Sequence, residues 1–240
     1  MSRFFVAPFS GDTAYLTGQE AHHVARVLRM RVGEELTLCD GEGTDYVCRI
    51  LSVDDGEVAA QVLYRRPTAS EPTTEVTLYQ GLPKSEKMDL IVQKCVEIGI
   101  ARIVPVAMAR SIVKLSVSDG AKKRDRWQKI AASAAEQSGR GIVPTVEQPV
   151  SFKQLLAAVK NEPTITFYEG GGEPLSSLVN EQTRKISLVI GPEGGFDADE
   201  IEQLREVGAR IATLGPRILR CETAPLVALS IVMQLTGNMN

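Results

Sequence analysis

The stretch that decides the fold is residues 186–196, ISLVIGPEGGF, followed by DADE at 197–200. Its first five residues form a short apolar run that is typical of a buried parallel strand. Asp197 and Glu200 have the spacing of a capping box, which predicts a helix start. Glycines between a strand and a helix leave no Cβ between the backbone and a ligand, and they allow positive φ. The stretch therefore predicts a strand–loop–helix junction, at the edge where open α/β sheets bind ligands.

The charge of this junction narrows the kind of ligand. Carboxylates crowd the loop and the first helical turn, at Glu193, Asp197, Asp199, Glu200 and Glu202. A phosphate-binding loop would carry Lys and Ser/Thr after its last glycine, and a dinucleotide fingerprint would read G-x-G-x-x-G; the chain has neither here. Carboxylates favour the helix dipole but repel phosphate. A cationic or neutral ligand fits better, and the alternative is a tight turn that merely starts a helix.

A second glycine-bearing loop lies at residues 214–224, LGPRILRCETA. It leads into residues 226–235, LVALSIVMQL, which are apolar almost all round and so predict a buried helix. This run is shorter than the roughly 18 apolar residues that a membrane span needs. We therefore expect it in the core or in a subunit interface.

The chain divides into two parts by pattern. Residues 1–70 predict a helix over 19–30, capped by Thr17 with Glu20, and strands over 35–39, 46–53 and 58–64, which together make a small barrel-like module. Residues 67–74 read as a linker. From residue 75, strands (76–80, 102–107, 164–168) alternate with helices (86–98, 119–137, 152–160), which predicts an α/β domain with a parallel sheet over 75–240.

Composition excludes several classes of protein. The net charge is −3, yet residues 71–150 hold 12 Lys/Arg against 9 Asp/Glu, with KKRDR at 122–126 as the densest cluster. A protein of acidic pI that binds RNA must focus its positive charge in this way, although such a run also suits a solvated helix face.

The four cysteines lack C-x-x-C spacing and the two histidines are adjacent, so we expect no metal site and no histidine-based hydrolase. No run predicts a signal peptide or a membrane span, so a cytoplasmic protein is expected.

At this separation, the two loops and the apolar helix after them resemble the SPOUT class of methyltransferases. More narrowly, the chain resembles the family that methylates ring nitrogen 3 of uridine 1498 in 16S ribosomal RNA of the small subunit. The resemblance extends to RFF at 3–5, HHVARVLR at 22–29, residues 84–99 and EQSGR at 136–140, and so to nearly the whole chain. It implies a PUA-like RNA-binding β-barrel over 1–70 and a SPOUT domain over 75–240. It also implies a deep trefoil knot, a homodimer and S-adenosylmethionine as the cofactor, whose cationic sulfonium agrees with the acidic loop.

The resemblance also implies roles for individual residues. The residues expected to cradle the cofactor are Tyr168, Glu169, Gly170, Gly191, Pro192, Glu193, Gly194, Gly195, Leu214, Gly215, Ile218, Leu219, Thr223 and Ala224. Nitrogen 3 of uridine must lose its proton before it attacks a methyl group. Arg220 and Arg140 are expected to stabilise the resulting charge, with Arg140 acting either in the same subunit or from the partner subunit, and Glu193 or Glu222 to accept the proton. Glu222 equally suits a charge beside a helix N-terminus.

The residues expected to contact RNA are Arg3, His22, His23, Arg26, Arg29, Lys84, Lys87, Arg110, Gln137, Ser138 and Arg140. The two histidines equally suit a solvated helix, and Gln137 and Ser138 equally suit a helix end capped by Gly139. The expected partner is 16S RNA in the assembled subunit, although free RNA stays open. Two other functions also remain: a SPOUT enzyme acting on transfer RNA or on a ribose 2′-hydroxyl, and a non-catalytic PUA-containing RNA-binding protein.

Overall fold

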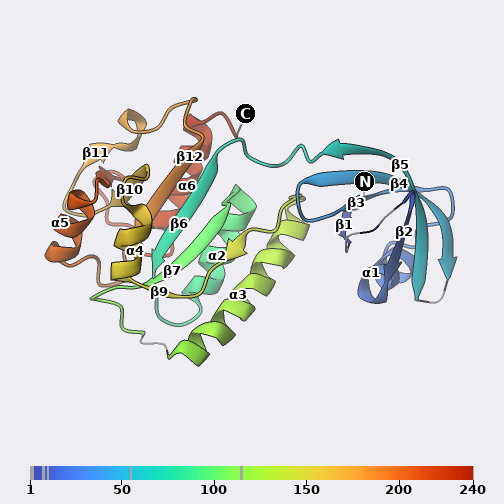
Figure 1. Ribbon diagram of the computed structural model, residues 1–240, viewed down its shortest axis with the longest axis horizontal. Coiled ribbons are helices and arrows are strands. Elements are labelled where there is room, and N and C mark those ends of the chain that lie inside the picture. The colour runs from blue at the N-terminus through green and yellow to red at the C-terminus, as the bar shows by residue number, and fades with distance from the viewer. Residues whose placement is uncertain (1–2, 7–8, 10, 55, 114–115, 240) are drawn as a thin grey trace. The chain divides into compact units, whose positions relative to one another are not determined.

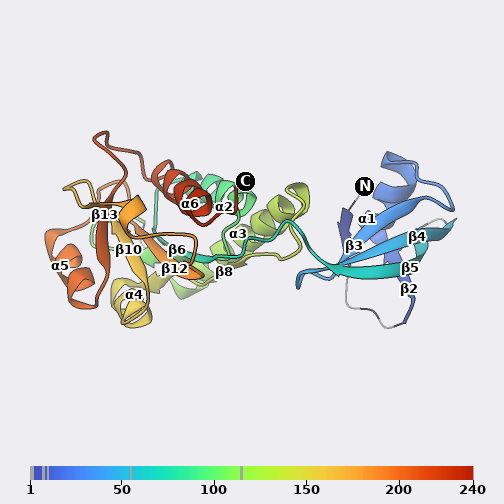
Figure 2. The same ribbon diagram turned by 90° about the horizontal axis from the view of Figure 1, so that it is seen from above.

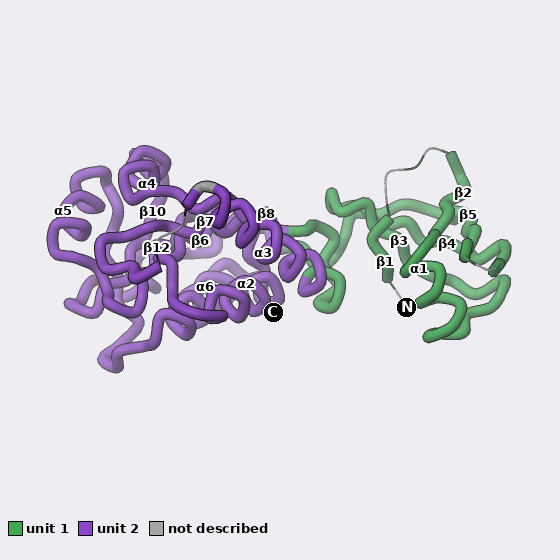
Figure 3. The backbone as a smooth tube through the Cα atoms, turned by 90° about the horizontal axis from the view of Figure 1, so that it is seen from below, with its two compact units in different colours: residues 1–71, 135–143 green, residues 72–134, 144–240 purple. Residues whose placement is uncertain are grey.

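The computed structural model describes residues 3–6, 9, 11–54, 56–113 and 116–239, and Figure 1 and Figure 2 give two views of it. The chain forms two compact units (Figure 3). One contains residues 1–71 and 135–143, and the other contains residues 72–134 and 144–240. The expected N-terminal module over 1–70 thus acquires a second piece of chain, which the sequence pattern assigned to the C-terminal domain.

The N-terminal unit is built on a five-stranded sheet of order β1-β3-β4-β5-β2. Its elements are β1 (Arg3–Phe5), β2 (Thr13–Thr17), α1 (Gly18–His22), η1 (His23–Val27), β3 (Glu35–Cys39), β4 (Thr44–Asp54) and β5 (Glu57–Pro67). β1 pairs with β3 in parallel and the other pairs are antiparallel. The predicted strands at 35–39, 46–53 and 58–64 are confirmed. One face of the sheet and the helix bury a shared core that includes Phe4, Leu16, Val24 and Leu38.

The first helix is shorter than predicted and begins differently. Thr17 makes no side-chain capping bond, so the expected capping box with Glu20 is wrong. The helix also widens to π geometry over His23–Val27. Arg29 has φ of 53°, and the Met30 N–H donates to the Val24 carbonyl, which closes the helix end in the manner of a left-handed cap. The helix therefore stops before the predicted end at residue 30.

Residues 135–143 are part of the N-terminal unit because their backbone is bonded to it. The Gly43 N–H donates to the Gly141 carbonyl at 3.1 Å, and the Cys39 thiol donates to the same oxygen at 3.2 Å. A Cβ at position 141 would lie 2.1 Å from the Thr68 hydroxyl oxygen, so only glycine allows this approach. Residues 135–143 are thus an integral part of the N-terminal unit.

The C-terminal unit is an eight-stranded sheet in which every pairing is parallel. Its order is β11-β13-β10-β12-β6-β7-β8, with β9 also pairing with β7. The strands are β6 (Glu75–Gly81), β7 (Arg102–Ala107), β8 (Thr145–Val146), β9 (Val150–Ser151), β10 (Thr164–Phe167), β11 (Glu173–Pro174), β12 (Lys185–Ile190) and β13 (Arg210–Thr213). The prediction of a parallel sheet with helical connections is confirmed.

Helices cover both faces of this sheet (Figure 2). They are α2 (Lys87–Ile98), α3 (Val117–Gln137), α4 (Phe152–Val159), α5 (Ala198–Glu206) and α6 (Ala224–Leu235), together with the short η2 (Leu175–Ser177). On one face α4 and α5 bury Leu155 and Leu204 against strand residues such as Val104 and Val189. On the other face α6 packs on β6, β12 and α2. Helices on both faces bury nearly every position of the central strands β6, β10 and β12, including the polar residues Thr77, Gln80 and Thr166.

The two helices that flank the glycine loops start as their sequences predict. The Asp197 side chain accepts the Asp199 N–H, and the Glu200 side chain accepts the Asp197 N–H, so the capping box of α5 is confirmed. Glu200 is buried and also accepts the Ala109 N–H at 2.8 Å, which ties α5 to the chain after β7. α6 has Pro225 in its first turn, where a missing N–H costs no hydrogen bond.

Candidate functional site

A cavity of about 890 Å³ opens at the carboxyl ends of β10, β12 and β13. These ends meet at one edge because the three strands are parallel neighbours. Three loops, at residues 167–171, 190–196 and 213–221, form its walls, together with Lys87 and Ala224. The cavity thus lies where open parallel sheets bind their ligands.

The sequence-predicted cofactor residues gather at this cavity. Those that line it are Tyr168, Glu169, Gly170, Gly191, Pro192, Glu193, Gly194, Gly195, Leu214, Gly215, Ile218, Leu219 and Ala224. Thr223 is the exception, and its backbone N–H donates to the Arg220 carbonyl at 2.8 Å. The lining also includes Phe167, Ile190, Arg217 and Cys221, which the sequence reasoning did not assign to the cofactor.

Close backbone packing holds the first loop, residues 191–196, in place. A Cβ at Gly81, the last residue of β6, would lie 2.5 Å from the Pro192 nitrogen. Gly195 has φ of 69°, and a Cβ there would lie 2.5 Å from Glu169 Oε1. The buried Gln80 amide donates to the Gly191 carbonyl at 3.4 Å. Sequence reasoning missed Gly81, although a glycine that ends a strand is a signal for such an approach.

Lys87 joins the two glycine loops at the cavity wall. Its ammonium lies 3.2 Å from Glu193 Oε1 and 3.0 Å from Glu222 Oε2. The Cys221 thiol donates to Glu222 Oε2 at 3.2 Å, and the Lys84 N–H donates to Glu193 Oε1 at 2.9 Å. Two predicted catalytic carboxylates are therefore brought together by a lysine that was predicted to contact RNA. Lys84 contributes its backbone to the same cluster.

Burial, hydrogen bonds and ion pairing together set the pKa values of this cluster. For both Glu193 and Glu222, burial acts to raise the pKa, but backbone hydrogen bonds and the Lys87 ammonium outweigh it, so both pKa values lie below 4.5. The hydrogen bond to Glu222 raises the pKa of Lys87 above 10.5. Burial and the neighbouring Glu222 raise the pKa of the Cys221 thiol to about 12. At neutral pH the cluster therefore holds one ammonium, two carboxylates and a protonated thiol.

Arginines of the site have different environments. Arg220 and Arg217 line the cavity on the second glycine loop, residues 214–224, and both are exposed. Arg110 donates to the Gly194 carbonyl at 3.2 Å and pairs with Asp197 at 3.4 Å, so it braces the first loop from outside. Arg220 is the predicted catalytic arginine that reaches the cavity.

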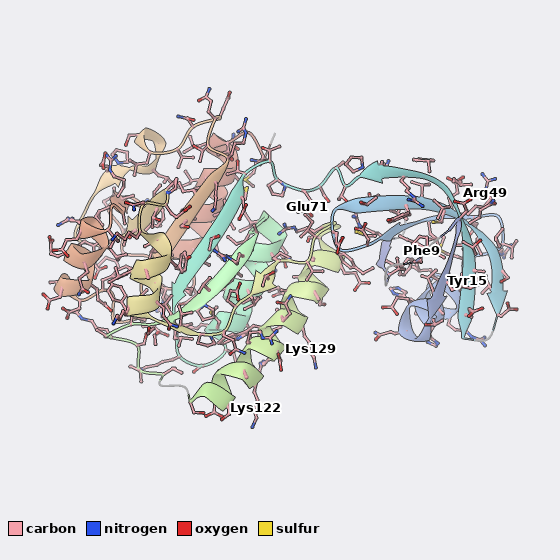
Figure 4. The ribbon with its side chains drawn as sticks, viewed as in Figure 1. Phe9, Tyr15, Arg49, Glu71, Lys122 and Lys129 are labelled. Carbon is pink, nitrogen blue, oxygen red and sulfur yellow. The ribbon has the colours of Figure 1, made fainter. Side chains whose placement is uncertain are left out.

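Arg140, predicted to act in catalysis and RNA binding, lies in the N-terminal unit and does not belong to the cavity lining among the described residues. It is 4% exposed, and its guanidinium pairs with Glu71 at 2.7 Å. Glu71 Oε1 also accepts the N–H groups of Gly141 and Ile142, at 2.7 and 3.1 Å. Through its pair with Glu71, which Figure 4 labels, Arg140 holds the segment 135–143 in the N-terminal unit.

The remaining RNA-binding candidates are spread over the N-terminal unit. His22 and Arg26 line a second hollow of about 690 Å³. The His23 ring packs edge-on against Phe4, with centroids 5.6 Å apart, and Arg29 forms the helix end. Arg3 pairs with Asp45 at 2.5 Å and donates to Thr68. His22 and Arg26 are therefore the two of these candidates that share a concave surface.

The end of α3 carries the last two RNA-binding candidates. The Ser138 hydroxyl donates to the Ala135 carbonyl at 3.4 Å, and Gln137 is exposed. Gly139 follows with φ of 71°, the conformation of a helix-ending glycine. Both side chains thus sit on an ordinary helix end of the N-terminal unit.

The described residues contain no group of three His, Cys, Asp or Glu side chains that could hold a metal ion. Within the same ranges, no helix is long and apolar enough to cross a membrane. All four cysteines are free and buried.

Comparison with known families gives the class. The model of the RNA methyltransferase domain matches residues 69–233, and that of the RNA methyltransferase PUA domain matches residues 16–63. The first match covers more than half of the chain, including both glycine loops. The chain is thus an RNA methyltransferase that carries an N-terminal PUA domain.

Similar proteins identify the family more narrowly. Ribosomal RNA small subunit methyltransferase E of Bacillus subtilis is 39% identical over 232 residues, which cover 93% of this chain and 91% of that protein. The protein of the same name from Mycobacterium tuberculosis is 34% identical, over 96% of this chain and 89% of its own length. The chain therefore belongs to the ribosomal RNA small subunit methyltransferase E family.

Solved structures agree with this assignment. The family member from Neisseria gonorrhoeae bound to S-adenosyl methionine superposes with a TM-score of 0.86, at 34% identity over 98% of both chains. A protein from Legionella pneumophila, solved with the same cofactor bound, gives a TM-score of 0.83, at 32% identity over 97% of this chain and 96% of that one.

Proposed function

We propose that this protein transfers a methyl group from S-adenosylmethionine to ring nitrogen 3 of uridine 1498 in 16S ribosomal RNA. The observation that carries the proposal is the cavity of about 890 Å³, whose walls include the two glycine loops, together with the S-adenosylmethionine bound in two similar solved structures. The alternatives, another RNA target or binding without catalysis, have no comparable support, because the named relatives are small-subunit methyltransferases.

The residues around the cavity fit this cofactor. Backbone at Gly191, Gly194 and Gly195 offers peptide groups at close range, and apolar side chains such as Ile190 and Leu219 can cover an adenine ring. When bound, the cofactor supplies a methyl group on a cationic sulfonium. The carboxylates of Glu169 and Glu193 at the cavity give that charge a favourable field.

The chain's own residues must prepare the uridine. Its nitrogen 3 has to lose a proton and align with the methyl group. Arg220, at the cavity and exposed, can stabilise the negative charge that develops on the uracil oxygens. Glu193 and Glu222 are ionised at neutral pH and so can accept a hydrogen bond from the N–H, but their lowered pKa values make them weak proton acceptors.

RNA binding is proposed to use the PUA domain together with basic residues elsewhere. His22 and Arg26 line the hollow of the N-terminal unit. Lys122 and Lys129 project from α3 (Figure 4), and both are exposed. Phosphate contacts of this kind make affinity strongly dependent on salt. We propose the assembled small subunit as the substrate.

We infer two further features of the architecture, a deep trefoil knot in the C-terminal domain and a homodimer formed through α6. We also infer that the protein is cytoplasmic. The support for the dimer is that α6 keeps apolar side chains partly exposed outside its buried face, at Leu226, Val227, Ile231 and Leu235. A catalytic contribution of Arg140 across such a dimer stays a prediction. Light scattering should give twice the chain mass of 26.1 kDa.

Two measurements test the function. Calorimetry should detect S-adenosylmethionine binding to the full chain, and its absence would leave an RNA-binding protein without catalysis. Mass spectrometry of small-subunit RNA from a deletion strain should show loss of one methyl group on uracil, restored by the wild-type gene. Loss of a methyl group from transfer RNA or from a ribose instead would support the other SPOUT activities.

A further inference from the structure

Lys87 connects three segments that are far apart in the sequence. It is the first residue of α2, and its ammonium reaches Glu193 in the first glycine loop and Glu222 in the second. The three side chains are 29%, 25% and 18% exposed, so solvent weakens these ion pairs only in part. One cation therefore bridges the two glycine loops, both of which line the cavity.

The two carboxylates differ in their other attachments. Glu193 also accepts the Lys84 N–H, which fastens the first loop to the chain before α2. Glu222 has the Cys221 thiol, its own sequence neighbour, as its other side-chain donor. Lys87 is thus what ties the second loop to the first. Without the ammonium, two like charges would face each other near the cavity and would repel.

This geometry argues against a direct RNA contact by Lys87. Its single positive charge is shared by two carboxylates within 3.2 Å, so little of it remains for a phosphate. Lys122 and Lys129 on α3, by contrast, are exposed along a basic helix. A lysine that neutralises its surroundings stabilises an arrangement of the protein more than it attracts a ligand.

We propose that Lys87 is a positioning residue of the donor cavity, which sets the separation of the two glycine loops by holding Glu193 and Glu222 on one ammonium. The inference rests on the proposed function, because S-adenosylmethionine is taken as the ligand between the loops. It assigns Lys87 to donor binding, acting through the two glutamates rather than by touching the reacting atoms.

The first test measures donor affinity by calorimetry on the full chain. Lys87→Met should raise the dissociation constant for S-adenosylmethionine about tenfold, and Lys87→Arg should recover part of the loss, since a guanidinium can also hold two carboxylates. Lys94→Met is the matched control, because Lys94 lies on the same helix and pairs with Glu97 at 2.8 Å. The control should bind the donor as wild type does.

The second test separates positioning from RNA contact. For Lys87→Met, the KM for the donor should rise, while the KM for RNA and the salt dependence of RNA binding stay unchanged. The reverse pattern, with normal donor affinity and a weaker salt dependence, would overturn the inference and make Lys87 a phosphate contact. A wild-type protein that binds no donor would overturn the proposed function, and the inference with it.

The third test asks whether the two glutamates act through the lysine. It uses variants of the glutamates, so it can be done even if Lys87→Met does not fold. Glu193→Gln and Glu222→Gln should each weaken donor binding, and their effects should be non-additive because both lose the same partner. Additive effects of the two substitutions in the otherwise wild-type chain would overturn the inference. In the Lys87→Met background the non-additivity should disappear.

Discussion

The two units each contain a cluster of one cation with carboxylate partners, but the clusters differ in what surrounds them. In the N-terminal unit the Arg140 and Glu71 side chains are 5% and 15% exposed, and Glu71 Oε1 also accepts the N–H groups of Gly141 and Ile142. In the C-terminal unit Lys87 shares its charge between two carboxylates beside an open cavity. The first cluster links Glu71 to the segment 135–143 of the same unit. The second links the two glycine loops beside a cavity that can hold a ligand.

These two clusters show why residue type alone is a poor guide to the role of a basic residue. Arg140 and Lys87 are both basic residues inside motifs that resemble an RNA methyltransferase, and both were predicted to contact RNA. A buried arginine with a bidentate carboxylate partner is expensive to unpair, so its removal should act mainly on stability. A partly exposed lysine at a cavity costs less to remove, so its effect should appear mainly in binding.

The largest expected effect tests the buried cluster. Arg140→Ala leaves the partly exposed Glu71 carboxylate without its cation, which should lower the free energy of unfolding of the N-terminal unit by up to about 3–5 kcal/mol. Denaturant titration with circular dichroism measures it. Arg49→Ala is the matched control, because its 3.0 Å pair with Glu35 is exposed and should be worth at most about 1 kcal/mol. Equal losses in the two variants would remove the distinction between buried and exposed pairs.

The next effect concerns catalysis. Arg220→Ala should lower turnover by about a hundredfold, the scale expected for losing one preorganised charge partner of a developing anion. Donor affinity should hardly change, because backbone groups supply most of the cavity wall around it. Single-turnover methylation at saturating RNA and donor measures the step. Normal turnover with weakened donor binding would instead make Arg220 a cofactor contact.

A smaller effect is expected where two backbones approach. Gly81→Ala puts a methyl group 2.5 Å from the Pro192 nitrogen, so the first glycine loop must move and donor affinity should fall about tenfold. Gly120→Ala on α3 is the control, since its Cβ would meet the Pro149 ring at an ordinary 3.5 Å. Calorimetry on both variants decides the prediction, and equal donor affinities would show that the loop adapts.

The smallest effect is a pH dependence of the buried cluster. Burial acts to raise the pKa of Glu71, but its hydrogen bond to Arg140 and the attraction of that guanidinium outweigh burial, so the folded pKa lies below 4.5. A carboxyl whose pKa is lowered by folding stabilises the fold fully above its unfolded pKa, and the contribution disappears as pH falls through the folded pKa. The stability gap between wild type and Glu71→Gln should therefore be constant near neutrality and shrink below about pH 4.5. A gap that grows in acid would contradict this sign.

Local sequence features predicted much of the C-terminal unit. The apolar run at 186–190 became a central parallel strand, and the Asp197–Glu200 capping box formed as spaced. Such features involve residues within a few positions of one another, so the local chain contains their causes. The same reasoning failed at Thr17, where the right residue types are present but the helix begins without a side-chain cap.

The sequence by itself determined a parallel α/β sheet with two glycine loops at its ligand-binding edge, because periodicity and glycine placement are local properties. Only the tertiary structure decided which charges pair. Arg140 with Glu71 and Lys87 with Glu193 and Glu222 are joined across about 70, 106 and 135 positions of chain. Only folding fixes those pairs, because the strength of an ion pair depends on the distance between the charges and on the solvent around them. Spacing along the chain sets neither quantity.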